Sequence, residues 1–160
     1  MTGNIRQMLP KDRDCVLAMM QDFYASPAVF TEGSQEIFIN DIDNCLCDNP
    51  FVEGYIIEKD GNIAGYAMIA KSWSTEFGKP CIWIEDLYLK EPYRGQGLGK
   101  HFFAFLTARY TDCIFRLEVE PENEPAVRLY RSSGFTVLPY TEMKKECAKQ
   151  PDVIKLSVSS

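Results

Sequence analysis

Residues Tyr93–Lys100 read Y-R-G-Q-G-L-G-K. They follow an apolar run with strand character, Ile82–Leu89, and they open a segment whose apolar residues are spaced by three and four, namely Leu98, Phe102, Phe105 and Leu106. This order predicts a strand, then a glycine-rich loop, then a helix that begins at the loop. The first N–H groups of a helix have no intrahelical partners and lie at the positive end of its dipole. Because glycine lets such a backbone approach a ligand, the stretch predicts a phosphate-binding loop that needs no metal.

Two common phosphate-binding patterns do not fit this stretch. The nucleoside-triphosphate loop needs serine or threonine after its lysine, whereas a histidine follows Lys100. The dinucleotide pattern G-x-G-x-x-G lacks its last glycine whether it is started at Gly95 or at Gly97. The pattern that fits is R-x-x-G-x-G, formed by Arg94, Gly97 and Gly99. Taken alone, it also fits an ordinary glycine-rich turn between a strand and a helix.

The rest of the chain divides into strand and helix patterns. Apolar alternation predicts strands at 4–9, 52–58, 63–71, 82–89, 113–120, 135–138 and 152–158. Apolar spacing and capping residues predict helices at 10–23, 34–46, 98–109 and 123–133. Asp60-Gly61 predicts a tight hairpin, residues 72–80 predict a loop, and residues 139–151 fit no element. The order β-α-α-β-β-β-α-β-α-β-β indicates an α/β protein with a mixed sheet and helices on both faces.

Composition indicates one domain over residues 1–160 and argues against nucleic acid and membranes as partners. The chain is 46 % apolar, with a formal net charge of −6 and a pI near 4.9. An acidic protein is not expected to bind nucleic acid, and its negative charge mildly favours a cationic small-molecule substrate. We see no signal peptide and no apolar run long enough for a membrane span, so we expect a cytoplasmic protein that does not bind membranes. A homodimer is an open option.

The six cysteines are scattered along the chain and do not form a disulfide pattern. Cys45 and Cys47 form a C-x-C pair, but His101, the sole histidine, lies far along the chain. We therefore expect free thiols and no metal site. A nucleophilic Cys–His pair is not expected either.

A second motif lies at Asn123–Phe135, which reads N-E-P-A-V-R-L-Y-R-S-S-G-F. It resembles the N-x-x-A-x-x-L-Y-x-x-x-G-F helix of the GNAT superfamily of acyl-CoA N-acyltransferases. The R-x-x-G-x-G pattern resembles the pyrophosphate loop of the same superfamily, and the element order matches its fold. Together these resemblances cover about two-thirds of the chain, whereas the first fifty residues resemble the family only in element order. They imply a mostly antiparallel central sheet that is splayed in its middle.

The resemblance implies acetyl-CoA as cosubstrate, without a metal. It implies that the main chain of the strand before the loop binds the pantetheine arm, through Leu87, Tyr88 and Leu89. It implies that the loop and helix start hold the pyrophosphate, through Arg94, Gly95, Gln96, Gly97, Leu98, Gly99 and Lys100. Solvated basic side chains at a helix start are the alternative for Arg94 and Lys100.

Asn123 and Tyr130 lie seven residues apart, which places them on nearly one helix face about 10 Å apart along the axis. Both can therefore contact one extended ligand. In the family, the tyrosine at the position of Tyr130 hydrogen-bonds the coenzyme sulfur and acts as general acid. Because a phenol has a pKa of about 10 and a thiol about 8.5, we expect Tyr130 to hydrogen-bond the developing thiolate and to pass its proton late. The alternative is an ordinary core tyrosine.

Acidic residues are candidates for binding the amine. An alkylamine has a pKa of about 10.4, so its neutral form costs about 4–5 kcal/mol at pH 7. Glu85 and Asp86 interrupt an apolar strand, and with Y-R-G-x-G-x-G they resemble the spermidine/spermine and diamine acetyltransferases, although Leu129 and Phe135 follow the wider superfamily. That resemblance implies that acidic residues here bind the amine and relay its proton. Our hypothesis is that Glu85 accepts the proton through water, while Asp86, Glu32 or Glu118 contributes negative electrostatic potential. The alternative is a buried acid bonded by the backbone.

Together these features predict acetyl transfer from acetyl-CoA to a primary amine by direct attack in a ternary complex. No acyl-enzyme is expected, because no Cys–His or Ser–His couple is present. The expected acceptor is a polyamine or another small cationic amine. The alternatives are a protein N-terminus, an antibiotic amine, or a non-catalytic CoA-binding module.

Overall fold

The computed structural model describes residues 3–29 and 33–148. In this part of the chain, five strands form one sheet in the order β1-β2-β3-β4-β5. The strands are β1 (Gly3–Gln7), β2 (Val52–Lys59), β3 (Asn62–Ser74), β4 (Lys79–Leu89) and β5 (Ile114–Leu117). Neighbours pair antiparallel except for β4 and β5, which pair parallel. The predicted mixed, mostly antiparallel sheet is confirmed.

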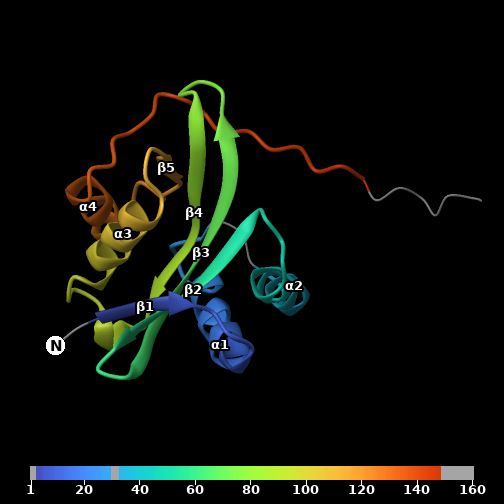
Figure 1. Cartoon of the computed structure of the whole chain (residues 1–160), viewed down its shortest axis with the longest axis vertical. Coiled ribbons are helices and arrows are strands. Elements are labelled where there is room, and N and C mark those ends of the chain that lie inside the picture. The colour runs from blue at the N-terminus through green and yellow to red at the C-terminus, as the bar shows by residue number, and fades with distance from the viewer. Residues whose placement is uncertain (1–2, 30–32, 149–160) are drawn as a thin grey trace, which may run out of the picture.

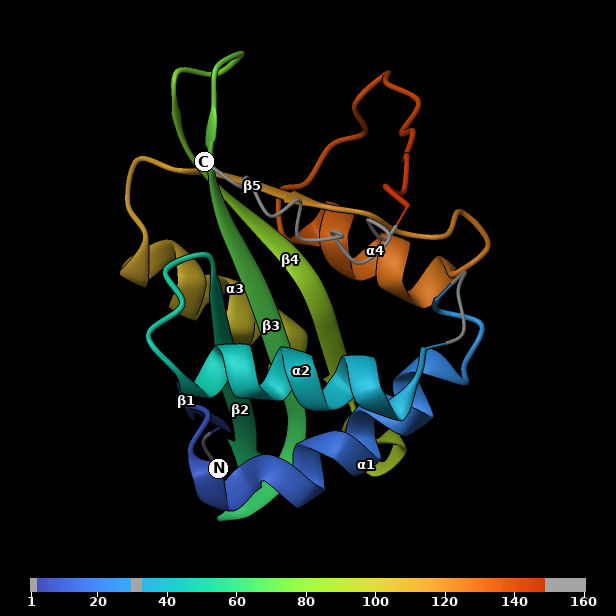
Figure 2. The same ribbon diagram turned by 90° about the vertical axis from the view of Figure 1, so that its right-hand side faces the viewer.

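Helices cover both faces of the sheet, as predicted (Figures 1 and 2). On one face lie α1 (Arg13–Tyr24), which continues a 3-10 turn η1 (Pro10–Asp12), and α2 (Gln35–Leu46). On the other face lie α3 (Leu98–Arg109), which follows a 3-10 turn η2 (Glu91–Tyr93), and α4 (Glu124–Ser132). The Ser34 hydroxyl accepts a hydrogen bond from the N–H of Ile37 at 3.2 Å, which caps α2 at its predicted start.

Each face of the sheet has its own hydrophobic core. Ile57 packs with Phe102 and Leu106 of α3, whereas its neighbour Ile56 packs with Met20 of α1 and with α2. Adjacent strand residues project to opposite faces, so a strand that is buried on both sides reads as a continuous apolar run. This arrangement explains why β2 and β3 lack a polar face at their centres.

The β2–β3 hairpin forms where the sequence predicts it. Asp60 and Gly61 have φ angles of 52° and 79°, so both residues occupy the left-handed region that a two-residue turn requires. The loop expected at 72–80 is shorter, because Trp73 pairs with Pro80 and Ser74 with Lys79. Backbone pairing therefore continues beyond the apolar alternation from which the loop was predicted.

The strand predicted at 135–138 is wrong. Phe135 packs individually against Phe103 and Tyr130, while Val137 is 80 % exposed and the segment pairs with no described strand. An apolar tetrapeptide without a partner strand cannot form the backbone hydrogen bonds of a β-sheet. The predicted strand at 152–158 lies outside the described residues, and residues 141–148 form no helix or strand.

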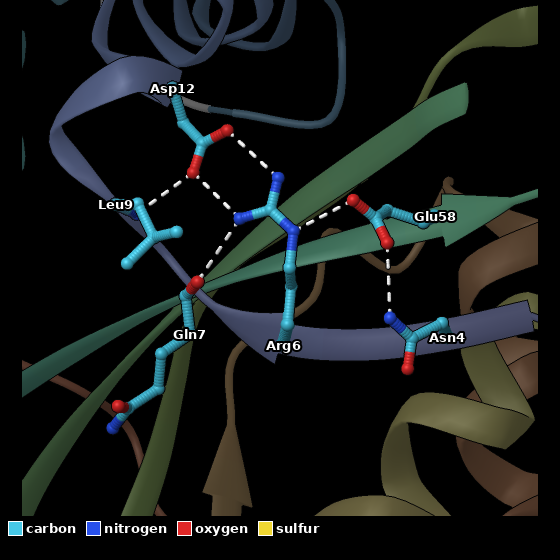
Figure 3. A network of polar contacts seen from close by, with 6 residues as sticks. All are labelled: Asn4, Arg6, Gln7, Leu9, Asp12 and Glu58. Carbon is cyan, nitrogen blue, oxygen red and sulfur yellow. Dashed lines mark hydrogen bonds and ion pairs between the residues drawn. The ribbon is translucent and has the colours of Figure 1, made fainter. Parts of the chain in front are cut away.

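A polar network ties β1 to β2 and to the start of the first helix (Figure 3). The Arg6 guanidinium donates to both carboxylate oxygens of Asp12, at 2.8 and 2.9 Å, and to Glu58 at 2.7 Å. Asp12 is 2 % exposed and also accepts from the N–H of Leu9 at 2.8 Å. Its hydrogen bond with Arg6 is the main reason that the pKa of Asp12 is lowered. Because both ends of the pair are satisfied, the network fixes the chain between β1 and α1.

We expect Asp12→Asn to destabilise the protein by about 3 kcal/mol at pH 7, because it removes the buried charge that pairs with Arg6 and leaves only Glu58 as a carboxylate partner. A lowered folded-state pKa contributes stability above the unfolded value, and this stability disappears as pH falls through the folded pKa. The gap in unfolding free energy between wild type and variant should therefore begin to narrow below about pH 4, near the unfolded pKa of a carboxyl, and close only below the lowered folded-state pKa. Denaturant unfolding at several pH values measures this gap.

The matched control is Asp43→Asn, which breaks the ion pair between Asp43 and Arg13. The side chain of Arg13 is 43 % exposed and that of Asp43 is 50 % exposed. An exposed pair of this kind contributes less than about 1 kcal/mol. Equal losses for the two variants would contradict a special role for Asp12.

Candidate active site

The parallel pairing between β4 and β5 ends halfway along β4. It runs from Cys81 opposite Ile114 to Ile84 opposite Leu117, and residues 85–89 of β4 have no β5 partner. Beyond this point β4 continues, whereas β5 ends and the chain that follows it runs toward α4 (Figure 2). β4 therefore separates from β5, the last strand of the described sheet, and one edge of β4 faces the gap, while the splay in the middle of the sheet stays a prediction.

Hydrogen bonding shows which main-chain groups of β4 face this gap. The N–H of Lys90 donates to the carbonyl of Ala64 at 2.8 Å, on the β3 side. Since main-chain groups alternate along an antiparallel strand, Tyr88 directs its own groups to β3, whereas Leu87 and Leu89 direct theirs to the gap. The Leu89 carbonyl accepts from Arg94 Nε at 2.8 Å, which agrees with this assignment. Of the three predicted residues, Leu87 and Leu89 thus offer backbone to the gap.

A β-bulge lies at Glu85, where the gap begins. Met68 of β3 pairs with Asp86 and the next residue, Ile69, pairs with Ile84, so Glu85 is an extra residue on β4. Ile84 and Leu87 contact the same core, which strict alternation forbids and the extra residue permits. Glu85 is exposed, and its side chain lines a cavity at this edge.

Asp86 lies beside Glu85 but projects to the face covered by α1. It is 4 % exposed, and its oxygens accept hydrogen bonds from Tyr66 at 2.7 Å and Tyr24 at 2.9 Å. Burial raises the pKa of Asp86, while these two bonds act in the opposite direction. Asp86 is therefore bonded by two phenols, where the sequence analysis expected a ligand for the amine.

A cavity of about 1700 Å³ extends from the gap along β4 and β5 to α4 and the end of α1. It brings together four predicted site residues, Glu85, Leu87, Asn123 and Tyr130, from segments that are far apart in the sequence. Glu118 lies in the same wall. Asp86 and the glycine-rich loop are not part of its lining, and Glu32 lies outside the described residues.

Tyr130 is held by aromatic packing on α4. Its ring packs edge-on against Phe103 at 5.9 Å and Phe135 at 6.0 Å between centroids, and burial raises the pKa of its hydroxyl. A phenol with a raised pKa stays protonated near neutral pH and can act as a hydrogen-bond donor. Asn123 caps the same helix, because its side-chain oxygen accepts from the N–H of Ala126 at 3.4 Å.

The cavity wall beside the gap is acidic. Although Glu85 is open to solvent on one side, the surrounding cavity wall desolvates its carboxyl group, and this, followed by the charges of Asp86, Glu142 and Asp41, raises the pKa of Glu85. Burial and a hydrogen bond with Glu142 raise the pKa of Glu118 to about 7. The sequence does not predict a role for Asp41 or Glu142, because neither belongs to a motif and both approach the site only through folding.

The three glycines of the loop have different tasks. Gly95 and Gly97 have φ angles of 72° and 82°, so each needs the left-handed region, and Gly97 is the N-cap of α3. Gly99 is helical, but a Cβ there would lie 2.7 Å from a methyl of Leu129 on α4. Gly99 therefore permits close approach of two helices. The side chain of Leu98 is 4 % exposed and belongs to the core, which leaves only its main chain for a ligand.

Parallel strands that separate, a glycine loop at a helix start and a tyrosine in the cavity beside the gap occur together here, as the resemblance to acyl-CoA-dependent acyltransferases implied. Residues 17–135 match the Acetyltransferase (GNAT) family. The chain belongs to this family and is an N-acetyltransferase.

Three comparisons illustrate the range of its relatives. A protein of Bacillus subtilis (strain 168), provisionally named a ribosomal protein bS18 alanine N-acetyltransferase, is 30 % identical over 133 residues, covering 81 % of this chain and 78 % of its own. The thialysine N-epsilon-acetyltransferase of Sus scrofa is 33 % identical over 98 residues, covering 54 % of this chain and 57 % of its own. The structure of AAC(6')-Iy with the bisubstrate analog CoA-S-monomethyl-acetylneamine is 17 % identical with a TM-score of 0.72, covering 92 % of this chain and all of its own.

Within residues 3–29 and 33–148, no helix is long and apolar enough to cross a membrane. In the same residues, no three His, Cys, Asp or Glu side chains gather as metal ligands. The expectation that the protein needs no metal stays a prediction.

We expect Gly99→Val to destabilise the protein by about 1–3 kcal/mol, the usual cost of overpacking, because its side chain overlaps Leu129. Adding Leu129→Ala should relieve the overlap, so the two changes together should cost at least about 1 kcal/mol less than their sum. Denaturant unfolding of the two single variants and the double variant measures this coupling.

Gly97→Ala serves as the comparison, because a Cβ at Gly97 meets nothing within 4 Å. Its cost, about 1–2 kcal/mol, comes from the left-handed backbone alone and should not change with Leu129→Ala. A coupling of the same size at Gly97 would show that Leu129 is not the specific partner of Gly99.

Proposed function

We propose that the protein transfers an acetyl group from acetyl-CoA to a small cationic primary amine by direct attack in a ternary complex. The observation that carries this proposal is the meeting of Leu87, Glu85 and Tyr130 around one cavity at the β4–β5 gap. Leu87 supplies unpaired strand backbone, Glu85 a carboxyl group and Tyr130 a phenol. These are the three groups that an amine acetylation without an acyl-enzyme needs.

The residues around the gap fit an acetyl-CoA cosubstrate. An amide-containing pantetheine arm can pair with the free edge of β4, where Leu87 and Leu89 direct their main-chain groups. At the start of α3, the first intrahelical bond runs from the N–H of His101 to the carbonyl of Gly97, so the N–H groups of residues 98–100 have no intrahelical acceptor. In our proposal these amides bind the pyrophosphate, with Gly95, Gln96 and Gly97 shaping the loop and Arg94 and Lys100 adding charge. Acetyl-CoA supplies the activated acetyl group.

Arg94 has a second task in this proposal, which is to hold the loop against β4. Its Nε bonds the Leu89 carbonyl, and its guanidinium lies over the ring of Tyr88, 5.7 Å from the centroid. Gln96 donates to the carbonyl of Pro92 at 2.8 Å and contacts Lys59 of β2. These bonds preorganise the loop before a ligand arrives.

Tyr130 acts on the leaving group. Its hydroxyl donates a hydrogen bond to the developing thiolate and passes its proton late in the reaction. The edge-on packing against Phe103 and Phe135 fixes the ring, so little side-chain entropy is lost when this bond forms. Asn123, the N-cap of α4, contacts the cosubstrate from the same helix.

Glu85 accepts the proton of the attacking amine, through a water molecule. The bulge places it at the edge of β4 next to Leu87, and its raised pKa brings it closer to the pKa of the amine than an ordinary carboxyl would be. Asp86 is a positioning residue, because its charge lies next to Glu85 while Tyr24 and Tyr66 hold it in the core. Glu118 adds negative electrostatic potential at the site of the amine, and Glu32 stays a candidate for the same role.

The acidic wall supports a cationic acceptor. Glu85, Glu118 and Glu142 surround the part of the cavity beside the gap, and an ammonium ion there would relieve their mutual repulsion. The relatives are named as a thialysine N-epsilon-acetyltransferase, an aminoglycoside N-acetyltransferase and, provisionally, an acetyltransferase of a ribosomal-protein alanine, and the substrates in the first two names are small amines. A small amine is therefore our first choice, which includes the polyamines, and a protein N-terminus is the second.

We expect Tyr130→Phe to lower kcat by about 10²- to 10⁴-fold, the range for a positioned acid, because it keeps the ring and removes the hydroxyl. The dissociation constant for acetyl-CoA should change by less than about threefold, since the strand edge and loop remain intact. Release of free CoA thiol in the presence of an amine measures turnover, and calorimetry measures binding.

Tyr110→Phe is the matched control, because its hydroxyl bonds Glu53 and it does not line the cavity. It should keep wild-type turnover within about threefold. Wild-type turnover in Tyr130→Phe would mean that the phenol has only a packing role.

A pH profile tests Glu85. In the wild type, kcat/KM should fall as pH drops through the raised pKa of Glu85, above the 4.5 of an ordinary glutamate. Glu85→Gln should remove this acid limb and lower kcat/KM about 10²- to 10⁴-fold. Asp86→Asn removes an adjacent negative charge, which lowers the pKa of Glu85 and should move the limb to lower pH. If Glu85→Gln keeps both the limb and kcat/KM, another group accepts the proton.

A further inference from the structure

Trp83 and Arg116 form a stacked pair in the cavity wall. They are direct neighbours in the register of β4 and β5, and the guanidinium carbon of Arg116 lies 4.6 Å from the centroid of the Trp83 ring. Both side chains line the same cavity as Glu85 and Tyr130. The proposed reaction assigns neither of them a task.

The Trp83–Arg116 pair projects to the face of the sheet that α1 covers, opposite the face that carries α3. Ile82 and Ile84 of β4 and Phe115 and Leu117 of β5 pack with the core under α3. By alternation along each strand, Trp83 and Arg116 project to the opposite face. This is the face of α1, whose last two residues, Phe23 and Tyr24, line the same cavity. The loop that would hold the pyrophosphate lies at the start of α3, on the other face.

Arg116 has no carboxylate partner among the described residues. Three other cations line the cavity: Lys79 pairs with Asp112 at 3.2 Å and Lys144 with Glu146 at 2.6 Å, while Arg131 lies in the last turn of α4 and makes no ion pair within residues 3–29 and 33–148. Stacking on Trp83 occupies a face of the guanidinium and leaves the N–H groups on its edge available. A guanidinium edge matches the two oxygens of a carboxylate. The half-buried Arg116 is thus prepared to bind an anion.

The wall is therefore electrically polarised along the strand direction. Glu118 follows Arg116 by two residues on the same face, which corresponds to about 7 Å along a strand. Glu118 and Glu85 lie at the end of the wall beside the gap, where the reaction takes place, and Arg116 lies farther away. An amine held at the acidic end would direct a substituent about 7 Å away toward Arg116.

We propose that the natural acceptor is an amphoteric amine, in which a carboxylate bound by Arg116 lies about 7 Å from the amine that is acetylated beside Glu85. A diamino acid with the length of lysine has this spacing. This inference rests on the proposed acetyl transfer to an amine and narrows its substrate class. It disfavours a polyamine, which carries no anion for Arg116.

The test compares lysine with lysinamide, which differ only in the carboxylate. For the wild type, kcat/KM for acetylation of the side-chain amine should be at least about tenfold higher with lysine, the effect of one hydrogen bond to a charged group. In Arg116→Gln, the ratio of the two kcat/KM values should fall to about one, because the amide side chain cannot pair with the carboxylate. Arg116→Lys keeps the positive charge but lacks the planar guanidinium that can donate two parallel hydrogen bonds, so it should retain part of the preference for lysine over lysinamide.

Lys79→Gln is the matched control, since it also removes a positive charge from the cavity wall. Because Lys79 is already paired with Asp112, the lysine-to-lysinamide ratio should stay at the wild-type value. Thermal unfolding and acetyl-CoA binding of each variant separate a lost contact from a lost fold. A ratio near one in the wild type, or a preference that survives in Arg116→Gln, would overturn the inference.

Two further outcomes distinguish this inference from the function on which it depends. If diamines without a carboxylate are acetylated and neither lysine nor lysinamide is, the acceptor is not amphoteric, although the proposed amine acetylation stands. If no amine of any kind releases CoA thiol, the proposed function falls and this inference falls with it.

Discussion

The early end of the parallel pairing between β4 and β5 is the constraint on which the site depends. After Ile84 and Leu117, residues 85–89 of β4 have no partner on the β5 side, so strand backbone faces the gap between these two strands. Unpaired main-chain groups in such a place need a partner, and an amide-bearing ligand can supply one. The cavity, the acidic wall and Tyr130 are all arranged around this edge.

The bulge at Glu85 converts the gap beside β4 into a site with two distinct faces. One extra residue lets Ile84 and Leu87 pack toward α3 while Asp86 projects toward α1, where Tyr24 and Tyr66 hold it. The strand therefore contributes backbone to the gap, a carboxyl group to its edge and a buried charge behind it. Bulges frequently direct side chains beside active sites in this way.

Charge is distributed unevenly around the cavity, and this pattern relates the fold to its acceptor. Glu85 and Glu118 lie near the gap, whereas Arg116, stacked on Trp83, lies farther along β5. Each strand alternates between a core face and a cavity face, so the residues that build the hydrophobic core also fix the positions of these charges. Substrate preference can therefore change at Arg116 without disturbing the loop or the gap.

The sequence by itself determined the features that depend on a few consecutive residues. Asp60-Gly61 specified the hairpin and Gly97 the start of α3, because a left-handed backbone is a local requirement that few residues meet. The tertiary structure decided the features that depend on a partner. Gly99 needs space because Leu129 approaches it, and the apolar segment 135–138 forms no strand because no described strand pairs with it. Likewise, no local pattern places Arg116 beside Trp83, since packing between distant segments sets which side chains meet.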